Sequence, residues 1–185
     1  MKVTVLGLWH LGTVTAACLA AAGHDVTGLD FDPGVIAGLD AGTPPLFEPG
    51  LEELVRAGRA SGRLRFTTDA AFAVPGRDVL WVTYDTPVDD EDRADVEYVL
   101  AQVRRTFPYL DAGTLVLISS QLPVGTARRL EQEFAGARPG IAVGFACSPE
   151  NLRLGKAIEV FSKPDRVIVG VRSAAGRARA IELFG

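Results

Sequence analysis

The chain has 185 residues, which is enough for one domain with a substantial apolar core. Hydrophobic residues make up 48% of it and charged residues 23%, and the formal net charge is -4, so there is no excess of Lys and Arg that would favour nucleic acid or a membrane surface. This composition is typical of a soluble globular domain with a small-molecule partner, no nucleic-acid partner and no membrane.

Short apolar runs alternate with helical patterns along the whole chain. Strand-like runs cover residues 3–6, 26–29, 79–82, 115–118, 141–145 and 167–169. Apolar residues at helical spacing cover residues 11–22, 50–59, 96–107, 126–134 and 173–184. Such alternation implies parallel strands covered by helices. We therefore predict one α/β domain over residues 1–185, a Rossmann-like doubly wound parallel sheet with helices on both faces.

The first strand, helix and second strand have the pattern of a dinucleotide-binding unit. Gly7 follows the first strand, Gly12 begins the helix, and Asp30 ends the second strand. Gly7 allows a tight turn, Gly12 lets the helix pack on the sheet, and the helix N-terminus offers N–H groups to a pyrophosphate. Asp30 is placed to accept hydrogen bonds from the adenosine ribose and to repel a 2′-phosphate. The unit therefore predicts NAD rather than NADP.

Trp9 departs from this pattern, because it stands where a second glycine normally lets the backbone approach the pyrophosphate. A working loop requires the indole to point out of it. His10 and Leu11 complete the predicted cofactor loop, although a loop histidine is more often a packing or surface residue. A Rossmann-like domain that binds no dinucleotide is the alternative interpretation.

Four later segments carry more specific patterns. Residues 43–54 (TPPLFEPGLEEL) form a proline-stiffened loop that leads into a helix with two acidic residues in its first turn. Thr86-Pro87 follows the third predicted strand, residues 119–126 read SSQLPVGT, and residues 148–155 read SPENLRLG. In this order the segments resemble the UDP-glucose/GDP-mannose dehydrogenase family, and the resemblance covers essentially all 185 residues.

The resemblance implies an enzyme that oxidises the C6 alcohol of a UDP- or GDP-sugar to a carboxylate, with two NAD per turnover and a cysteine that holds the aldehyde and then a thioester. Glu150 matches the family carboxylate that orients or deprotonates the hydrolytic water. Thr86, Pro87 and Ser120 match positions beside the cofactor. The plainer alternative for Glu150 is an exposed or capping carboxylate.

Two departures from the family concern catalysis and substrate. Gln121 stands where the family usually has a threonine that helps to bind the catalytic water, so we assign it with Glu150 to the catalytic set. Residues 150–153, which are Glu150, Asn151, Leu152 and Arg153, match the substrate-binding segment, in which Asn151 replaces an aromatic residue. These changes suggest a divergent branch whose sugar nucleotide the sequence does not name.

The family's catalytic cysteine belongs to a region that has no counterpart here. Cys18 lies in the first predicted helix and Cys147 at a strand end, without the spacing of a disulfide or metal site, which suits a reducing cytoplasm. We expect a fragment that lacks the central and C-terminal substrate domains, no bound metal, and a full-length homodimer formed through the central region.

Two other functions compete with this interpretation. Another two-domain hydride-transfer dehydrogenase would explain the first unit but leave residues 43–54 and 148–155 unexplained. A non-catalytic nucleotide-binding or interaction module with a Rossmann fold draws its support from Trp9 and from the missing catalytic parts.

Overall fold

A computed structural model of the chain describes residues 1–150 and 152–185. The elements follow in the order β1 (Lys2–Leu6), α1 (His10–Ala21), β2 (Asp25–Leu29), α2 (Pro33–Asp40), α3 (Leu51–Ala60), β3 (Leu64–Thr67), α4 (Ala70–Ala73), β4 (Val79–Val82), α5 (Val96–Arg104), the 3-10 helix η1 (Phe107–Tyr109), β5 (Leu115–Ile118), α6 (Thr126–Ala137), β6 (Gly144–Cys147), α7 (Ala157–Ser162), β7 (Gly170–Val171) and α8 (Ala174–Phe184).

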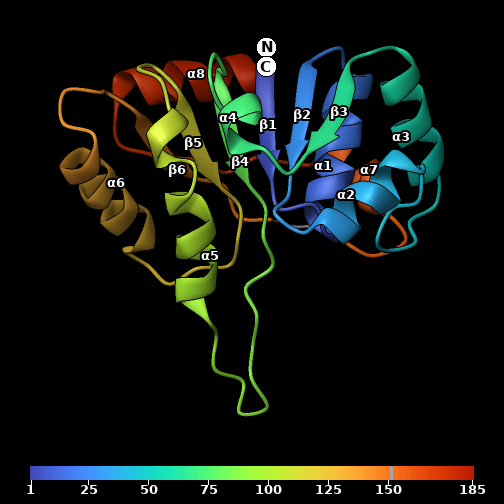
Figure 1. Cartoon of the computed structure of the whole chain (residues 1–185), viewed down its shortest axis with the longest axis horizontal. Helices are drawn as coiled ribbons and strands as arrows, with labels where there is room; N and C mark the ends of the chain where they lie inside the picture. Colours follow the sequence, from blue (N-terminus) through green and yellow to red (C-terminus); the bar gives the residue numbers. More distant parts are fainter. Residues whose placement is uncertain (151) are drawn as a thin grey trace.

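One seven-stranded sheet in the order β3-β2-β1-β4-β5-β6-β7 organises the molecule (Figure 1). The chain builds outward from β1 to β3, returns to place β4 on the other side of β1, and builds outward again. The strands from β3 to β6 are parallel. The reversal between β1 and β4 is the switch point at which doubly wound sheets bind ligands. The predicted fold class is confirmed.

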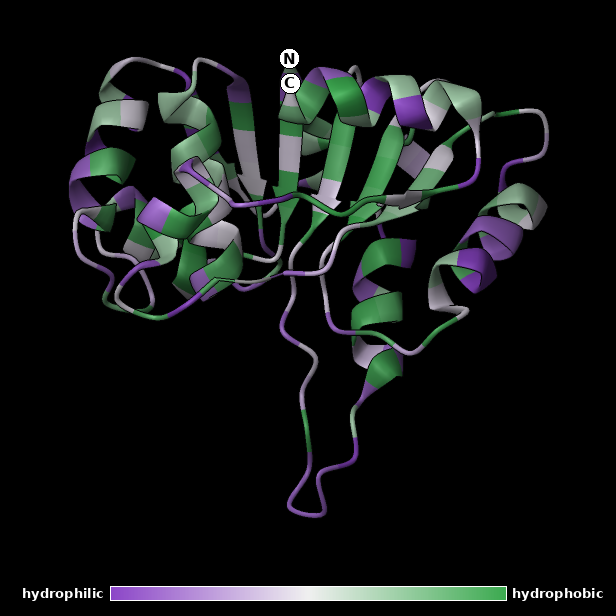
Figure 2. Cartoon of the chain, turned by 180° about the vertical axis from the view of Figure 1, so that it is seen from behind, coloured by the Kyte–Doolittle hydropathy of each residue, from purple (hydrophilic) through white to green (hydrophobic). Residues whose placement is uncertain are grey.

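The core has two layers, one on each face of the sheet. Alternate strand residues point to opposite faces, so Trp81 of β4 packs with the α1 and α3 side, and Leu80 and Val82 pack with the α5 and α6 side. The central strands are mostly apolar and the outer helix surfaces are largely polar (Figure 2). Burial on both faces explains why the strands read as continuous apolar runs.

The sequence patterns missed β3 and three short helices, α2, α4 and α7. β3 contains the polar residues Arg65 and Thr67 and lies at the sheet edge, where it pairs with β2 through Val26 and Leu64. A four-residue edge strand has too little apolar pattern to be distinguished from a loop. α2 and α4 are set by aspartate caps: Asp32 accepts from the N–H of Gly34, and Asp69 from the N–H of Ala71.

The last two strands are displaced from their predicted positions. β6 begins at Gly144 rather than at residue 141, and β7 is Gly170–Val171 rather than residues 167–169. β7 is also antiparallel, with Cys147 opposite Gly170. A parallel strand needs a crossover that returns to the amino end of the sheet, and α7 has six residues, about 9 Å of helix. The chain therefore re-enters the sheet at its carboxyl end.

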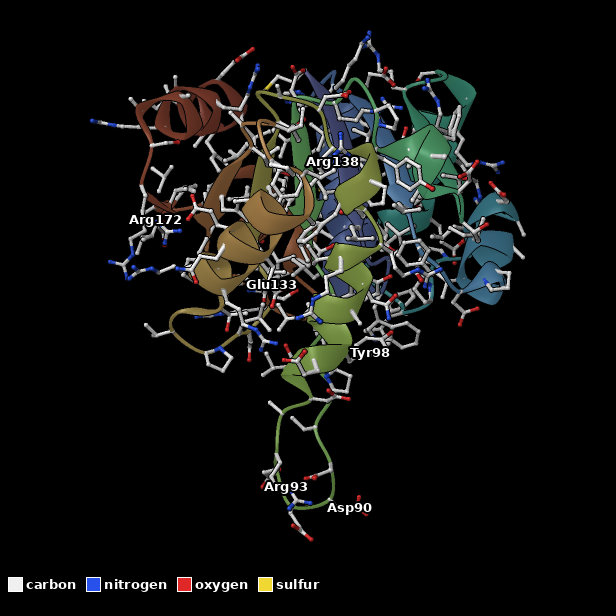
Figure 3. All side chains as sticks on the ribbon, turned by 60° about the vertical axis from the view of Figure 1, so that its left-hand side comes forward. Asp90, Arg93, Tyr98, Glu133, Arg138 and Arg172 are labelled. Carbon is white, nitrogen blue, oxygen red and sulfur yellow. The ribbon has the colours of Figure 1, made fainter. Side chains whose placement is uncertain are left out.

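The connection between β4 and α5, residues 83–95, projects from the carboxyl end of the sheet. Asp90 and Arg93 lie at its tip and Tyr98 near its base (Figure 3). Within the projection Arg93 donates to Asp89 at 2.8 Å, and Val88 forms an isolated antiparallel bridge with Ala94. These local bonds give the projection its hairpin-like course.

Helices α5 and α6, on the same face of the sheet, are joined by an ion pair. Glu133 of α6 receives two bonds from the guanidinium of Arg104, at 2.8 and 3.0 Å. A bidentate pair of this kind has defined geometry, which a single lysine contact would lack. It fixes α6 beside the base of the projection.

Gly12 should not tolerate a side chain. A Cβ there would lie 1.7 Å from the carbonyl oxygen of Gly7, so α1 would have to move away from the sheet. We expect Gly12→Ala to lower the free energy of unfolding by at least about 2 kcal/mol. Urea unfolding followed by circular dichroism measures this.

Gly136 of α6 provides the matched control, since a Cβ there meets nothing within 4 Å. Gly136→Ala should be neutral or stabilising by up to about 1 kcal/mol. Equal effects of the two substitutions would contradict the steric explanation.

Candidate functional site

The loop between β1 and α1 is held in a conformation that only glycine adopts easily. Gly7 has φ +94°, its N–H donates to the carbonyl of Leu29 at 2.9 Å, and its carbonyl accepts from the hydroxyl of Thr83 at 2.7 Å. Within residues 1–150 and 152–185, the backbone N–H groups of Leu11 and Gly12 have no hydrogen-bond acceptor. The first turn of α1 is thus open to an anion, as a pyrophosphate site requires.

Trp9 fits this loop without needing glycine's freedom. Its φ of -76° and ψ of -150° are extended, and 49% of the residue is exposed. Trp9 is therefore not buried within the loop.

Asp30 stabilises the glycine loop through hydrogen bonds that its position in the sequence does not indicate. It is 7% exposed, and one carboxylate oxygen accepts from the N–H of Leu8 at 2.7 Å while the other accepts from the N–H of Asp32 at 3.0 Å. The carboxylate therefore ties the glycine loop to the end of β2. Two acidic residues, Asp30 and Asp32, thus follow one another closely at the end of β2.

A cation that the sequence pattern did not reveal lies near this end of β2. The guanidinium carbon of Arg105, the C-terminal cap of α5, lies 3.4 Å from the centre of the Phe31 ring. Stacking on the ring holds it by a cation–π interaction. The site therefore has both acidic and basic groups, although no basic residue directly follows Asp30.

A pocket of about 130 Å³ lies at the carboxyl end of the sheet. Its lining comes from α1 and from the loops after β4, β5 and β6, and consists of Leu11, Tyr84, Asp85, Thr86, Ser119, Ser120, Gln121 and Glu150. Five residues assigned from the sequence, Leu11, Thr86, Ser120, Gln121 and Glu150, are therefore brought together. Pro87 and His10 are not part of the lining.

Hydrogen bonds connect the loops around the pocket. The indole N–H of Trp81 donates to the hydroxyl of Ser119 at 2.9 Å, and that hydroxyl donates to the carbonyl of Ser148 at 2.8 Å. The Thr86 hydroxyl donates to the backbone carbonyl of Gln121 at 2.7 Å. The pocket walls are thereby held in fixed relative positions.

Ser120 contributes a hydroxyl that a bound group could satisfy. Its oxygen is buried and has no hydrogen-bond partner in the described part of the chain. Buried polar atoms are normally paired, so an unpaired one in a pocket suggests a ligand atom. Together with the open first turn of α1, this hydroxyl fits a dinucleotide cofactor.

Of the described residues in the segment that the sequence assigned to substrate binding, only Glu150 lines the pocket. The Glu150 carboxylate lines it and accepts a hydrogen bond from the N–H of Leu152. The Leu152 side chain packs against the core, and Arg153 is exposed. Asn151 lies outside the described residues.

Asp85 was not selected from the sequence, yet it lines the same pocket as Glu150. Its partly desolvated position raises the pKa of the Asp85 carboxyl, an effect that the nearby His10 opposes. The sequence feature that could have identified Asp85 as a site residue is its position directly before Thr86-Pro87. It gives the pocket a second carboxylate.

Glu48 is the second residue that the sequence left without a role. It is 3% exposed and accepts from Nε2 of His10 at 3.0 Å, from the N–H of Gly155 at 2.8 Å and from the N–H of Ala157 at 2.9 Å. Burial by itself would raise the pKa of Glu48, but these bonds outweigh it and lower the pKa. The ionised form therefore contributes stability at neutral pH, which is lost as pH falls through the lowered pKa.

A larger hollow of about 530 Å³ lies at the β3 edge, away from this pocket. Its three arginines are paired with carboxylates: Arg56 with Glu52, Arg59 with Asp40 and Arg65 with Asp25. The pairing leaves no uncompensated positive charge for an anion.

No group of three or more His, Cys, Asp or Glu side chains in residues 1–150 and 152–185 is arranged to hold a metal ion. None of the helices in those ranges is long and apolar enough to cross a bilayer.

Solved structures of similar fold come from nucleotide-sugar dehydrogenases. A UDP-glucose dehydrogenase from Pyrobaculum islandicum superposes with a TM-score of 0.91 and 34% identity, covering 99% of this chain and 43% of that one. A GDP-mannose dehydrogenase from Pseudomonas aeruginosa, solved as a ternary complex, gives a TM-score of 0.90 and 30% identity over 100% of this chain and 44% of that one.

Sequence comparison gives the same result. UDP-glucose 6-dehydrogenase from Rhizobium meliloti is 42% identical over 182 residues, which are 98% of this chain and 42% of that protein. The chain thus spans about two fifths of the length of the curated relatives it matches. The family model for the NAD binding domain of the UDP-glucose/GDP-mannose dehydrogenase family matches residues 1–185. The chain therefore belongs to the UDP-glucose/GDP-mannose dehydrogenase family and forms its NAD-binding domain.

Proposed function

We propose that this chain supplies the NAD site and the water-activating carboxylate of an enzyme that oxidises the C6 alcohol of a UDP- or GDP-sugar to a carboxylate. The observation that carries the proposal is the pocket in which Ser120, Gln121 and Glu150 meet beside the N-terminus of α1. The same pocket thus holds groups suited to the cofactor and to the chemical step. When bound, NAD supplies a hydride acceptor there.

Glu150 acts on water in this proposal. Its carboxylate lies at the pocket wall and is held by the N–H of Leu152, so it can accept a proton from a water molecule or orient it. Gln121 provides amide groups that can hydrogen-bond the same water, in place of the threonine hydroxyl usual in the family. Asp85 adds a second carboxyl to the same pocket, and its partial burial raises the pKa of that carboxyl.

The cofactor contacts are proposed along the edge of the sheet. The backbone of Gly7, Trp9, His10, Leu11 and Gly12 receives the pyrophosphate, and Asp30 receives the adenosine ribose. Thr86, Pro87 and Ser120 face the nicotinamide half. The open first turn of α1 and the unpaired Ser120 hydroxyl support this assignment.

UDP-glucose is the first substrate to test, because the Rhizobium meliloti relative named for it is 42% identical, while the GDP-mannose 6-dehydrogenase from Pseudomonas putida is 35% identical. We place substrate contacts at Glu150, Asn151, Leu152 and Arg153.

The cysteine nucleophile, the substrate domains and a homodimer contact would belong to further sequence of the complete protein. The two unpaired cysteines favour a cytoplasmic setting. A non-catalytic module is not favoured by these similarities.

The chain alone should not turn over sugar nucleotides. Burial raises the pKa of the Cys18 thiol to about 11, and partial desolvation raises the pKa of Cys147, so neither is a ready nucleophile. Assays of residues 1–185 with NAD and UDP-glucose or GDP-mannose should show no NADH formation, while the complete gene product should produce two NADH per sugar. Turnover by the chain alone would contradict this assignment, and inactivity of the complete product with every sugar nucleotide would overturn the proposed function.

The chain should prefer NAD to NADP. Asp30 and Asp32 place negative charge where the 2′-phosphate would lie, and we expect titration calorimetry to give at least about tenfold weaker NADP binding, or 1.4 kcal/mol. Arg105→Gln should weaken NADP further and leave NAD nearly unchanged, since Arg105 is the cation stacked beside this end of β2. Equal affinities of the parent for the two cofactors would show that Asp30 does not face the ribose.

Trp9 should report on NAD binding. Because the indole is half exposed at the loop, its fluorescence should change when NAD binds, and Trp9→Gly should preserve or improve the affinity. Trp9→Phe is the appropriate fluorescence blank. Trp81 is unsuitable for substitution because its indole N–H is bonded to Ser119 at the pocket. If Trp9→Gly creates binding that the parent lacks, the indole closes the parent site.

A further inference from the structure

Glu48 is a buried carboxylate whose hydrogen-bond donors come from two segments far apart in the sequence. One donor is the side chain of His10, and the others are the backbone N–H groups of Gly155 and Ala157. In residues 1–150 and 152–185 it has no lysine or arginine partner. Burying a carboxylate is unfavourable unless such donors satisfy it, so the three bonds are needed together.

The three donors belong to two different parts of the proposed site. His10 is the first residue of α1, whose first turn faces the pyrophosphate position. Gly155 and Ala157 end the loop that begins at Ser148 and carries Glu150 into the pocket. Glu48 therefore lies between the cofactor end and the carboxylate end of the site without lining the pocket.

The cofactor end and the carboxylate end of the site donate hydrogen bonds to the same oxygen atom of Glu48. Oε2 of Glu48 accepts both from Nε2 of His10 at 3.0 Å and from the N–H of Gly155 at 2.8 Å. Because an ionised carboxylate can only accept, Nε2 of His10 carries the hydrogen. A displacement of the first turn of α1 would move this oxygen relative to Gly155 and so shift the loop that holds Glu150.

We propose that Glu48 is a positioning residue that couples occupancy of the dinucleotide loop to the placement of the Glu150 loop, through the His10–Glu48–Gly155 hydrogen bonds. The inference rests on the proposed function, since it assigns a purpose to Glu150. A purely structural Glu48 would cap α7 equally well with or without NAD. A coupling Glu48 tightens its bonds to Gly155 and Ala157 when NAD binds at the first turn of α1.

Hydrogen exchange at the Gly155 and Ala157 amides, measured by NMR on residues 1–185, tests the coupling. Saturating NAD should slow exchange at both amides by at least about fivefold in the parent chain. In His10→Phe, which lacks the donor but leaves both amide bonds to Glu48, exchange is measured at an NAD concentration that calorimetry shows to saturate the variant, and the slowing should fall below about twofold. His10→Gln, whose amide can donate in place of Nε2, should restore it.

Glu52→Gln is the matched control, because Glu52 is an exposed carboxylate of the same segment that pairs with Arg56. It should show the parent's NAD-dependent protection.

Protection in His10→Phe equal to that of the parent would overturn the coupling. So would NAD binding to the parent without slower exchange at Gly155 and Ala157, a result that does not depend on any variant folding and leaves the proposed function intact. Failure of the parent to bind NAD in calorimetry would instead overturn the proposed function and the coupling with it.

Discussion

The close contact between the start of α1 and the turn after β1 determines how the rest of the site is built. Gly12 has no side chain, so α1 lies against the carbonyl of Gly7 at a distance that any Cβ would prevent. Thr83 then bonds that carbonyl, and Asp30 bonds the N–H of Leu8, so three strands converge on one turn. This convergence points the unsatisfied N–H groups of α1 toward the open end of the sheet.

Backbone N–H groups, rather than lysine or arginine, stabilise the buried carboxylates around this turn. Asp30 receives two such bonds and Glu48 receives two, with His10 as the additional donor to Glu48. Such donors belong to the backbone, so no long flexible side chain has to be positioned to make these bonds.

The pocket walls depend on hydrogen bonds between loops that follow different strands. Trp81, Ser119 and Ser148 form a chain across β4, β5 and β6, and Thr86 joins the β4 loop to Gln121. Bonded together, the loops hold Glu150 and the unpaired Ser120 hydroxyl in one small volume, as water activation beside a cofactor requires.

The amino-acid sequence by itself determined the doubly wound sheet, the glycine turn and the family, because the short apolar runs that alternate with helical patterns, Gly7 and Gly12, and the motif at residues 148–155 are local patterns. Only the tertiary structure decided the edge strand β3, the antiparallel β7 and the shared bonds of Glu48, since each depends on a partner distant in the chain. Pairing across a sheet and burial of a charge are properties of the folded surroundings, and no spacing rule within one segment encodes them.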